Sequence, residues 1–377
     1  MARPICSAQY SLVECPLEIV SGIPVVSLRI AGSEPLLAMI DTGFEGNILD
    51  RDVARRLKLH SGPVRKEAQP GGTLTTTTLR SVALTLGGFR VEQVAFSTLP
   101  IAALGAVLGR PTVAILGHAF LKRFVVELDY GRGLLRLWEP PGWRYRGSGA
   151  TLPVRFLDEQ VLVDCELGLP SGRKLVAPYK LDTGSLSLAG LALNYVKNAK
   201  IIEPGIHERI VSGIAMGGST EARVFRAHHF RLGKTVVENP TMAYVVEAGG
   251  FENRKFAGTV GAPILMLHNL ILDYPRKRIF LERRPQVHLA EDLSGMYLVS
   301  PPPEFSVLVV AQVFPGGAAD TAGLKEGDQV LAIDGVPCKL EKARRLLQLP
   351  QARTLHYRRG EREFVTTLQP QPYPPLG

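Results

Sequence analysis

Two copies of the sequence Asp-Thr-Gly are the residues of this chain whose types and spacing best suggest chemistry. One begins at Asp41 and the other at Asp182, and each follows an apolar run. Two carboxyl groups that lie close together cannot both ionise readily, so they share one proton and their apparent pKa values split. The ionised group can then take a proton from water while the protonated group polarises a carbonyl. A pair formed by these aspartates would hydrolyse an amide bond with neither a metal nor another cofactor.

A longer internal repeat surrounds the two Asp-Thr-Gly sequences. Leu-Asp-Tyr at 128–130 recurs at 272–274, and an apolar-apolar-Gly sequence that ends at Gly117 recurs at Gly261. Gly-Gly at 71–72 and Leu-Gly at 86–87 recur at 217–218 and 232–233. Five marks in one order make residues 1–143 and 151–290 two copies of one unit. The rest of the chain shares none of these marks, so we predict domains at 1–145, 146–290 and 291–377.

The elements that must position the aspartates are predicted to be short strands. The chain has 38 Gly and 28 Pro, which favours turns between short strands. Strands are predicted at 25–30, 36–40, 79–86, 90–96, 124–129 and 134–138, and in the second copy at 161–167, 175–181, 223–232, 236–246 and 278–282. Short helices are expected at 50–57 and 191–197. In each copy a strand ends at the aspartate, and the glycine two residues later allows a tight turn that a Cβ would obstruct.

Taken together, these marks resemble a retropepsin-like aspartic peptidase in its single-chain form, with both lobes on one polypeptide. The sequences that carry the resemblance are IDTGFEGNILD (40–50), LDTGSLSLAG (181–190), AILG (114–117) and GTVG (258–261). It implies a mainly β fold with two β-barrel lobes related by pseudo-two-fold symmetry. It also implies that each apolar-apolar-Gly segment crosses beside a catalytic loop. Because both lobes are on one chain, a dimer would not be required for the active site.

The resemblance also implies roles for individual residues. Asp41 and Asp182 would be the catalytic pair, and the threonines would hydrogen-bond across the lobe interface. The residues expected to support the pair are Thr42, Gly43, Thr183, Gly184 and Ser185. Mobile flap tips that close over an extended peptide are expected at Gly71, Gly72, Gly217 and Gly218.

One position departs from the symmetry of the two copies. Ser185 follows the second Asp-Thr-Gly and carries a hydroxyl that can bond to the adjacent carboxylate, whereas Phe44 follows the first. We therefore expect the two aspartates to be non-equivalent: either the Asp41 side is less well ionised, or its outer oxygen relies on solvent.

The third segment has a different character. FPGGAADTAGLKEGDQVLAIDG (314–335) resembles the core of a PDZ domain, a β-sandwich-like fold with two helices. Such domains bind an extended peptide by adding it to a sheet edge. The groove is expected at Gly295, Met296, Tyr297 and Leu298, opposite a helix at 341–349. Its groove could recruit substrate, or the domain could only pack on the peptidase.

Composition excludes several other classes of function. The net charge of +9 is spread as +5, +5 and −1 over residues 1–150, 151–290 and 291–377, so it lacks the clustered basic patch of a nucleic-acid-binding protein. The four cysteines form no CxxC pair, which argues against a zinc site. The uncharged stretch 94–109 is too short to span a membrane. The chain is expected to be soluble, either cytoplasmic or a mature envelope protein without its leader.

Two function hypotheses remain at this stage. The first is an aspartic endopeptidase that cleaves protein or peptide substrates, with the PDZ domain recruiting or positioning them. The second is a catalytically inactive retropepsin-fold scaffold that binds peptides together with the PDZ domain. In that case both Asp-Thr-Gly sequences would be structural turns.

Overall fold

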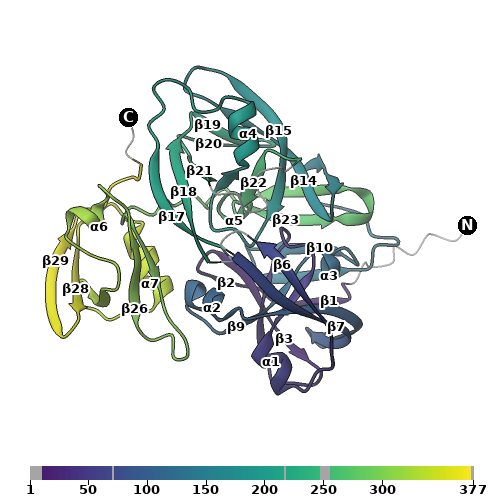
Figure 1. The fold of residues 1–377 in the computed structure, drawn as a ribbon. Coiled ribbons are helices and arrows are strands. Elements are labelled where there is room, and N and C mark those ends of the chain that lie inside the picture. The colour runs from purple at the N-terminus through teal and green to yellow at the C-terminus, as the bar shows by residue number, and fades with distance from the viewer. Residues whose placement is uncertain (1–10, 70–71, 216–217, 247–254, 375–377) are drawn as a thin grey trace, which may run out of the picture.

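The computed structural model describes residues 11–69, 72–215, 218–246 and 255–374 of the chain. The fold is mainly β throughout (Figure 1). The first repeat contains β1 (Val13–Pro16), β2 (Glu18–Val20), β3 (Ile23–Ile30), β4 (Leu36–Ile40), β5 (Asn47–Asp50), α1 (Arg51–Arg56), β6 (Ser61–Gln69), β7 (Gly72–Leu86), β8 (Phe89–Leu99), α2 (Ala102–Leu108), β9 (Thr112–Leu116), α3 (His118–Leu121), β10 (Val125–Asp129) and β11 (Leu134–Trp138).

The second repeat follows the same rhythm of short strands with minor helices. Its elements are β12 (Ala150–Pro153), β13 (Arg155–Leu157), β14 (Gln160–Gly168), β15 (Lys174–Asp182), β16 (Ala189–Leu191), α4 (Leu193–Asn198), β17 (Arg209–Ala215), β18 (Gly218–Arg226), β19 (His229–Leu232), β20 (Thr235–Glu238), β21 (Thr241–Val245), β22 (Gly258–Gly261), α5 (Ala262–Leu265), β23 (His268–Asp273), η1 (Tyr274–Arg276) and β24 (Arg278–Arg283).

Each repeat has a sheet of its own that carries one aspartate. In the first, eight strands lie in the order β2-β3-β4-β9-β5-β8-β7-β6, and an additional pairing of β3 with β7 closes the path. A sheet that closes on itself encloses its inward side chains, and Val26, Leu28 and Ile30 of β3 are accordingly buried. In the second, β15 lies between β14 and β22 in the order β17-β18-β21-β16-β22-β15-β14-β19-β20.

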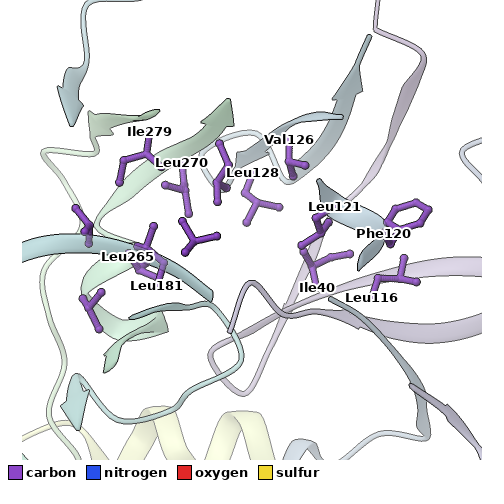
Figure 2. Packing of buried hydrophobic residues seen from close by; sticks show 14 of the residues in the cluster. Ile40, Leu116, Phe120, Leu121, Val126, Leu128, Leu181, Leu265, Leu270 and Ile279 are labelled. Carbon is purple, nitrogen blue, oxygen red and sulfur yellow. The ribbon is translucent and has the colours of Figure 1, made fainter. Parts of the chain in front are cut away.

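A third sheet joins the two repeats. Its order is β1-β11-β10-β23-β24-β12, with antiparallel β10 and β23 at its centre. One contiguous apolar core runs through both repeats and includes Ile40 and Leu181, the residues that precede the two aspartates. Leu116 and Leu265 lie in the same cluster (Figure 2). The strands that end at the aspartates are therefore anchored in a shared core.

Two predicted strands differ from the sequence-based expectations, and the helices α2, α3 and α5 were not predicted. Residues 223–232 and 236–246 each form two strands, because the chain changes sheet partners at 227–228 and 239–240. β18 pairs with β21, whereas β19 pairs with β14. The helix α2 lies within the uncharged stretch 94–109. Among the described residues, no helix is long and apolar enough to cross a membrane.

The C-terminal segment forms a separate five-stranded sheet with its own core. Its elements are β25 (Met296–Val299), β26 (Leu308–Val313), α6 (Ala318–Thr321), β27 (Gln329–Ile333), α7 (Leu340–Leu347), β28 (Arg353–Arg359) and β29 (Arg362–Leu368). It lies beside α2 of the first repeat, where Ser300 N donates to Ala106 O at 2.8 Å (Figure 1). Arg226 of β18 contacts the other side of this segment through an ion pair with Glu291.

Candidate active site

Both Asp-Thr-Gly loops are held by the same strand arrangement. β4 ends immediately before Asp41 and runs parallel to β9, while β15 ends at Asp182 and runs parallel to β22. After each loop the chain returns as β5 or β16 on the other side of that partner strand. β9 and β22 therefore each lie between the strand that enters a loop and the strand that leaves it. These are the two apolar-apolar-Gly segments that the resemblance implied would cross there.

A glycine faces the loop backbone at the end of each crossing strand, Gly117 directly after β9 and Gly261 as the last residue of β22. A Cβ on Gly117 would lie 2.2 Å from Gly46 O, and a Cβ on Gly261 would lie 1.9 Å from Ser187 O. No side chain fits at either position, since real Cβ atoms do not approach heavy atoms so closely. The absence of a side chain lets each loop pack directly on the end of its crossing strand.

Thr42 and Thr183 join the two loops through reciprocal hydrogen bonds. Thr42 N donates to Thr183 Oγ1 at 3.1 Å, and Thr183 N donates to Thr42 Oγ1 at 3.1 Å. Each hydroxyl in turn donates to the opposite strand, Thr42 to Leu181 O at 3.0 Å and Thr183 to Ile40 O at 2.7 Å. Both threonines are fully buried. The four bonds hold the loops in one relative position.

The glycines of the two motifs pack against the carboxyl group of the opposite loop. A Cβ on Gly43 would lie 2.2 Å from Asp182 Cγ, and a Cβ on Gly184 would lie 2.5 Å from Asp41 Cγ. Neither glycine has a positive φ. The reason for glycine is therefore the close approach of a carboxyl group, and not the tight turn that we expected. Each glycine N–H also donates to the aspartate of its own loop, at 2.8 Å for Gly43 and 3.1 Å for Gly184.

Asp41 sits in an environment that favours its protonated form. Burial raises its pKa to about 8, with the charge of Asp182 and a hydrogen bond between the two carboxyls acting in the same direction. The charge of Lys180 and the N–H of Gly43 act in the opposite direction and are outweighed. The surroundings of Asp41 therefore favour a proton on this carboxyl.

Lys180 is a residue of this site that our sequence analysis missed. Its Nζ lies 2.9 Å from Asp182 Oδ2 and donates to Gly43 O at 3.1 Å. The side chains of Lys180 and Asp182 are each only 14% exposed. A signal for it was present, because the corresponding residue of the first repeat is the apolar Met39. Residues two apart in a strand share one face, so a lysine here had to lie beside the aspartate.

Ser185 occupies a different place from the one expected. Asp182 Oδ1 accepts the N–H of Gly184, and Oδ2 contacts Lys180. In the described part of the chain, no hydrogen bond joins the Ser185 hydroxyl to Asp182. The serine instead uses its backbone carbonyl to accept from Ala262 N at 2.9 Å. Oδ2 of Asp182 is therefore in contact with the ammonium group of Lys180 and not with the hydroxyl of Ser185.

Gly72 and Gly218, two of the expected flap glycines, lie at the ends of two long strand pairs. β6 and β7 pair as far as Gln69 with Gly72, and β17 and β18 pair as far as Ala215 with Gly218. Gly72 and Gly218 are the first residues of their strands, while Gly71 and Gly217 lie outside the described residues.

The expected PDZ groove residues lie at an edge of the five-stranded sheet. Gly295 directly precedes β25, which contains Met296, Tyr297 and Leu298 and pairs only with β26 among the described strands. The helix that faces β25 is α7, and Arg344 belongs to this helix. Its guanidinium donates to Leu298 O at 2.7 Å and stacks over the Tyr297 ring at 5.3 Å. One backbone acceptor on the open edge of β25 is thus taken by a side chain of the same domain.

A metal-dependent centre has no candidate within the residues that the structure describes, where no group of three or more His, Cys, Asp or Glu side chains is placed to hold an ion. The aspartate pair brings two carboxyls and the ammonium of Lys180 together in one place.

Family models match two regions of the chain, one in the first repeat and one in the C-terminal segment. Residues 26–120, which include Asp41 and Gly117, match a family model described as aspartyl protease, and residues 309–359 match one described as PDZ domain. Rhophilin-1 of Mus musculus is 41% identical over 69 residues, or 18% of this chain, and the chain spans only about a tenth of that relative's length. A solved structure of EIAV protease complexed with the inhibitor HBY-793 is 22% identical and covers 26% of this chain and 86% of its own, with a TM-score of 0.20.

Proposed function

We propose that this chain, which carries an aspartyl protease domain and a PDZ domain, is an aspartic endopeptidase with Asp41 and Asp182 as its catalytic pair. One observation carries the proposal. The two Asp-Thr-Gly loops are linked by reciprocal threonine hydrogen bonds, and the glycine of each packs on the carboxyl group of the other. This arrangement brings together two carboxyls from residues 141 positions apart in the sequence. Their proximity and unequal protonation are what general acid–base hydrolysis requires.

The proposed reaction begins with one proton on the pair, held by Asp41. Asp182 accepts a proton from water as the water oxygen attacks the scissile carbonyl carbon, and Asp41 gives its proton to the carbonyl oxygen. A tetrahedral diol results. When the carbon–nitrogen bond breaks, Asp182 returns its proton to the leaving nitrogen and Asp41 takes one from a hydroxyl. The pair ends in its starting state, so no cofactor takes part.

We further propose the division into two peptidase lobes, 1–145 and 146–290, and a PDZ domain at 291–377. In support, each repeat has its own sheet, and the C-terminal segment has its own apolar core. Since both loops belong to one chain, the site forms without a second copy.

The PDZ domain is proposed to bind an extended peptide along β25 and so to recruit or position substrate. The edge position of β25 and the facing helix α7 support this mode of binding. Peptides with a free C-terminal carboxylate should bind more tightly than the same peptides with an amidated end, measured by fluorescence polarisation. Equal affinity for the two forms would argue against this groove.

The test of the peptidase is a cleavage assay on a peptide library, read by mass spectrometry. Asp41→Asn and Asp182→Asn should each lower kcat/KM by about 10³-fold or more, because each removes one acid–base group. Circular dichroism should show that both variants remain folded. Asp164→Asn, at an exposed carboxylate, is the matched control and should retain full activity. Full activity in either dyad variant would overturn the mechanism.

A peptide-binding scaffold without turnover is the second candidate, and the contact of Lys180 with Asp182 favours it. An ammonium group at 2.9 Å makes a carboxylate a weaker base. This hypothesis predicts tight binding of a hydroxyl-containing peptide inhibitor but no cleavage at any pH between about 3 and 8. Turnover of any library peptide would exclude it.

A further inference from the structure

Over the five residues that precede each aspartate, the two Asp-Thr-Gly strands differ in charge at one position, which lies two residues before the aspartate. Lys180 holds this position in β15, and Met39 holds it in β4. Met39 is buried in an apolar cluster with Ile48 and Ile115, whereas the ammonium of Lys180 contacts Asp182. The cation therefore acts on one side of an otherwise reciprocal arrangement.

The Lys180 side chain contacts groups of both repeats. Its Nζ contacts Asp182 Oδ2 of its own strand at 2.9 Å and donates to Gly43 O of the opposite loop at 3.1 Å. With Lys180 and Asp182 only 14% exposed, solvent screens this pair weakly. One ammonium, one carboxylate and one protonated carboxyl carry no net charge. A second proton would leave the buried cluster positive, and the loss of the first would leave it negative.

We propose that Lys180 is a positioning residue that makes Asp182 the ionised member of the pair and leaves the shared proton on Asp41. This inference rests on the proposed function of the pair. It assigns the water-activating role to the second repeat and the carbonyl-polarising role to the first. Burial of Asp41 acts in the same direction, because it favours the protonated form of that carboxyl.

Other groups around Lys180 do not compete for this role. The residues opposite it on the neighbouring strands are Leu162 of β14 and Thr259 of β22, and neither titrates. From the loop of the first repeat, Asp41 is the titratable group that interacts with Asp182, the partner of the ammonium.

Two titratable side chains lie behind the pair. Tyr274 interacts with the charge of Asp41, and burial raises the pKa of its hydroxyl far above the neutral range, so it stays uncharged. His118 packs on Tyr274 with 5.3 Å between ring centroids and forms its ion-pair contact with Glu159 at 3.1 Å. Burial lowers the pKa of His118 and so disfavours its charged form.

The decisive variant is Lys180→Met, which gives the second repeat the residue of the first. Loss of the cation should make the pair harder to ionise, so the acid limb of the kcat/KM profile should move up by about one pH unit or more. Lys180→Arg keeps the charge and should keep the acid limb near its original pH. Met39→Leu is the control on the other strand and should leave both limbs in place. If Lys180→Met lowered kcat/KM equally at every pH and left both limbs of the profile in place, the inference would be overturned.

A readout without turnover separates this inference from the proposed function. Carboxyl ¹³C resonances of labelled aspartates, assigned with Asp41→Asn and Asp182→Asn, report which carboxyl ionises first. In the wild-type chain Asp182 should ionise at the lower pH, and in Lys180→Met its titration should move up. An unchanged Asp182 titration in Lys180→Met would overturn the role of Lys180 whether or not the chain cleaves peptides. Absence of cleavage together with the expected titration would overturn only the peptidase.

Discussion

The two Asp-Thr-Gly loops have the same backbone contacts but different electrostatic surroundings. In both, the glycine N–H donates to its own aspartate, and the threonine hydroxyl bonds to the opposite strand. In the first loop the carboxyl of Asp41 is buried and has no cation on its own strand. In the second, Lys180 contacts the carboxyl of Asp182.

The comparison shows that the features that position the carboxyls are not the features that give them different roles. The reciprocal hydrogen bonds and glycine contacts depend on shape, and they are the same on both sides. The division into one acid and one base requires unequal surroundings. Because both repeats belong to one chain, each loop can carry its own side chains, which is impossible when two identical chains form the site.

The glycine contacts test the shared geometry and should show the largest effects. Gly43→Ala and Gly184→Ala would each place a Cβ within 2.5 Å of the opposite carboxyl carbon, so the carboxyls must separate. A displacement of about 1 Å can cost 100-fold in rate, and we expect at least that loss of kcat/KM from either variant. Gly46→Ala is the matched control, since its Cβ would meet only a side chain at 3.6 Å. Near-normal activity in Gly184→Ala alone would show that the loops are not equivalent.

The threonine bonds test the same equivalence through stability. Thr42→Val and Thr183→Val each leave a buried N–H without its acceptor and a buried carbonyl without its donor. Each should lower the free energy of unfolding by about 2 to 5 kcal/mol, measured by urea denaturation. Thr112→Val is the control, because its buried hydroxyl has no hydrogen-bond partner among the described residues. A large gap between the costs of the two threonine variants would contradict reciprocity.

The pH dependence of stability tests the difference between the loops. The pKa of Asp41 is raised from 3.8 to about 8 in the folded chain, so between these values the folded state holds a proton that the unfolded state has lost. Stability should fall as pH rises through this range, by up to about 1.4 kcal/mol per pH unit. Asp41→Asn removes this titration. Between pH 4.5 and pH 7.5 the variant should therefore lose less stability than the wild-type chain. Parallel pH profiles of melting temperature for the two proteins would contradict the raised pKa.

The smallest effect is expected at Ser185. Its hydroxyl makes no hydrogen bond to Asp182 in the described part of the chain, so Ser185→Ala removes no interaction of the pair. Such substitutions change free energies by no more than about 0.5 kcal/mol, or roughly twofold in rate. A loss of tenfold or more in kcat/KM, with binding of peptide inhibitor unchanged, would show that the serine contacts Asp182 during catalysis.

Local patterns predicted the strands well where one partner strand persisted. The strand at 36–40 and the strand ending at Asp182 follow from apolar runs bounded by turn residues. The runs at 223–232 and 236–246 were wrong as single strands, because an alternating pattern continues through a point where the chain leaves one neighbour for another. Pairing partners lie far away in the chain, and a window of ten residues holds no information about them.

The sequence by itself determined that two aspartates would stand at the ends of apolar strands in a duplicated unit, because repeated motifs in a constant order are visible in one dimension. It also contained the exchange of Met39 for Lys180, although its meaning was hidden. Only the tertiary structure decided that each glycine meets the other loop's carboxyl, that the threonines bond reciprocally and that Lys180 spans to Gly43. These contacts join groups nearly 140 residues apart, and their geometry depends on how two sheets pack around one core.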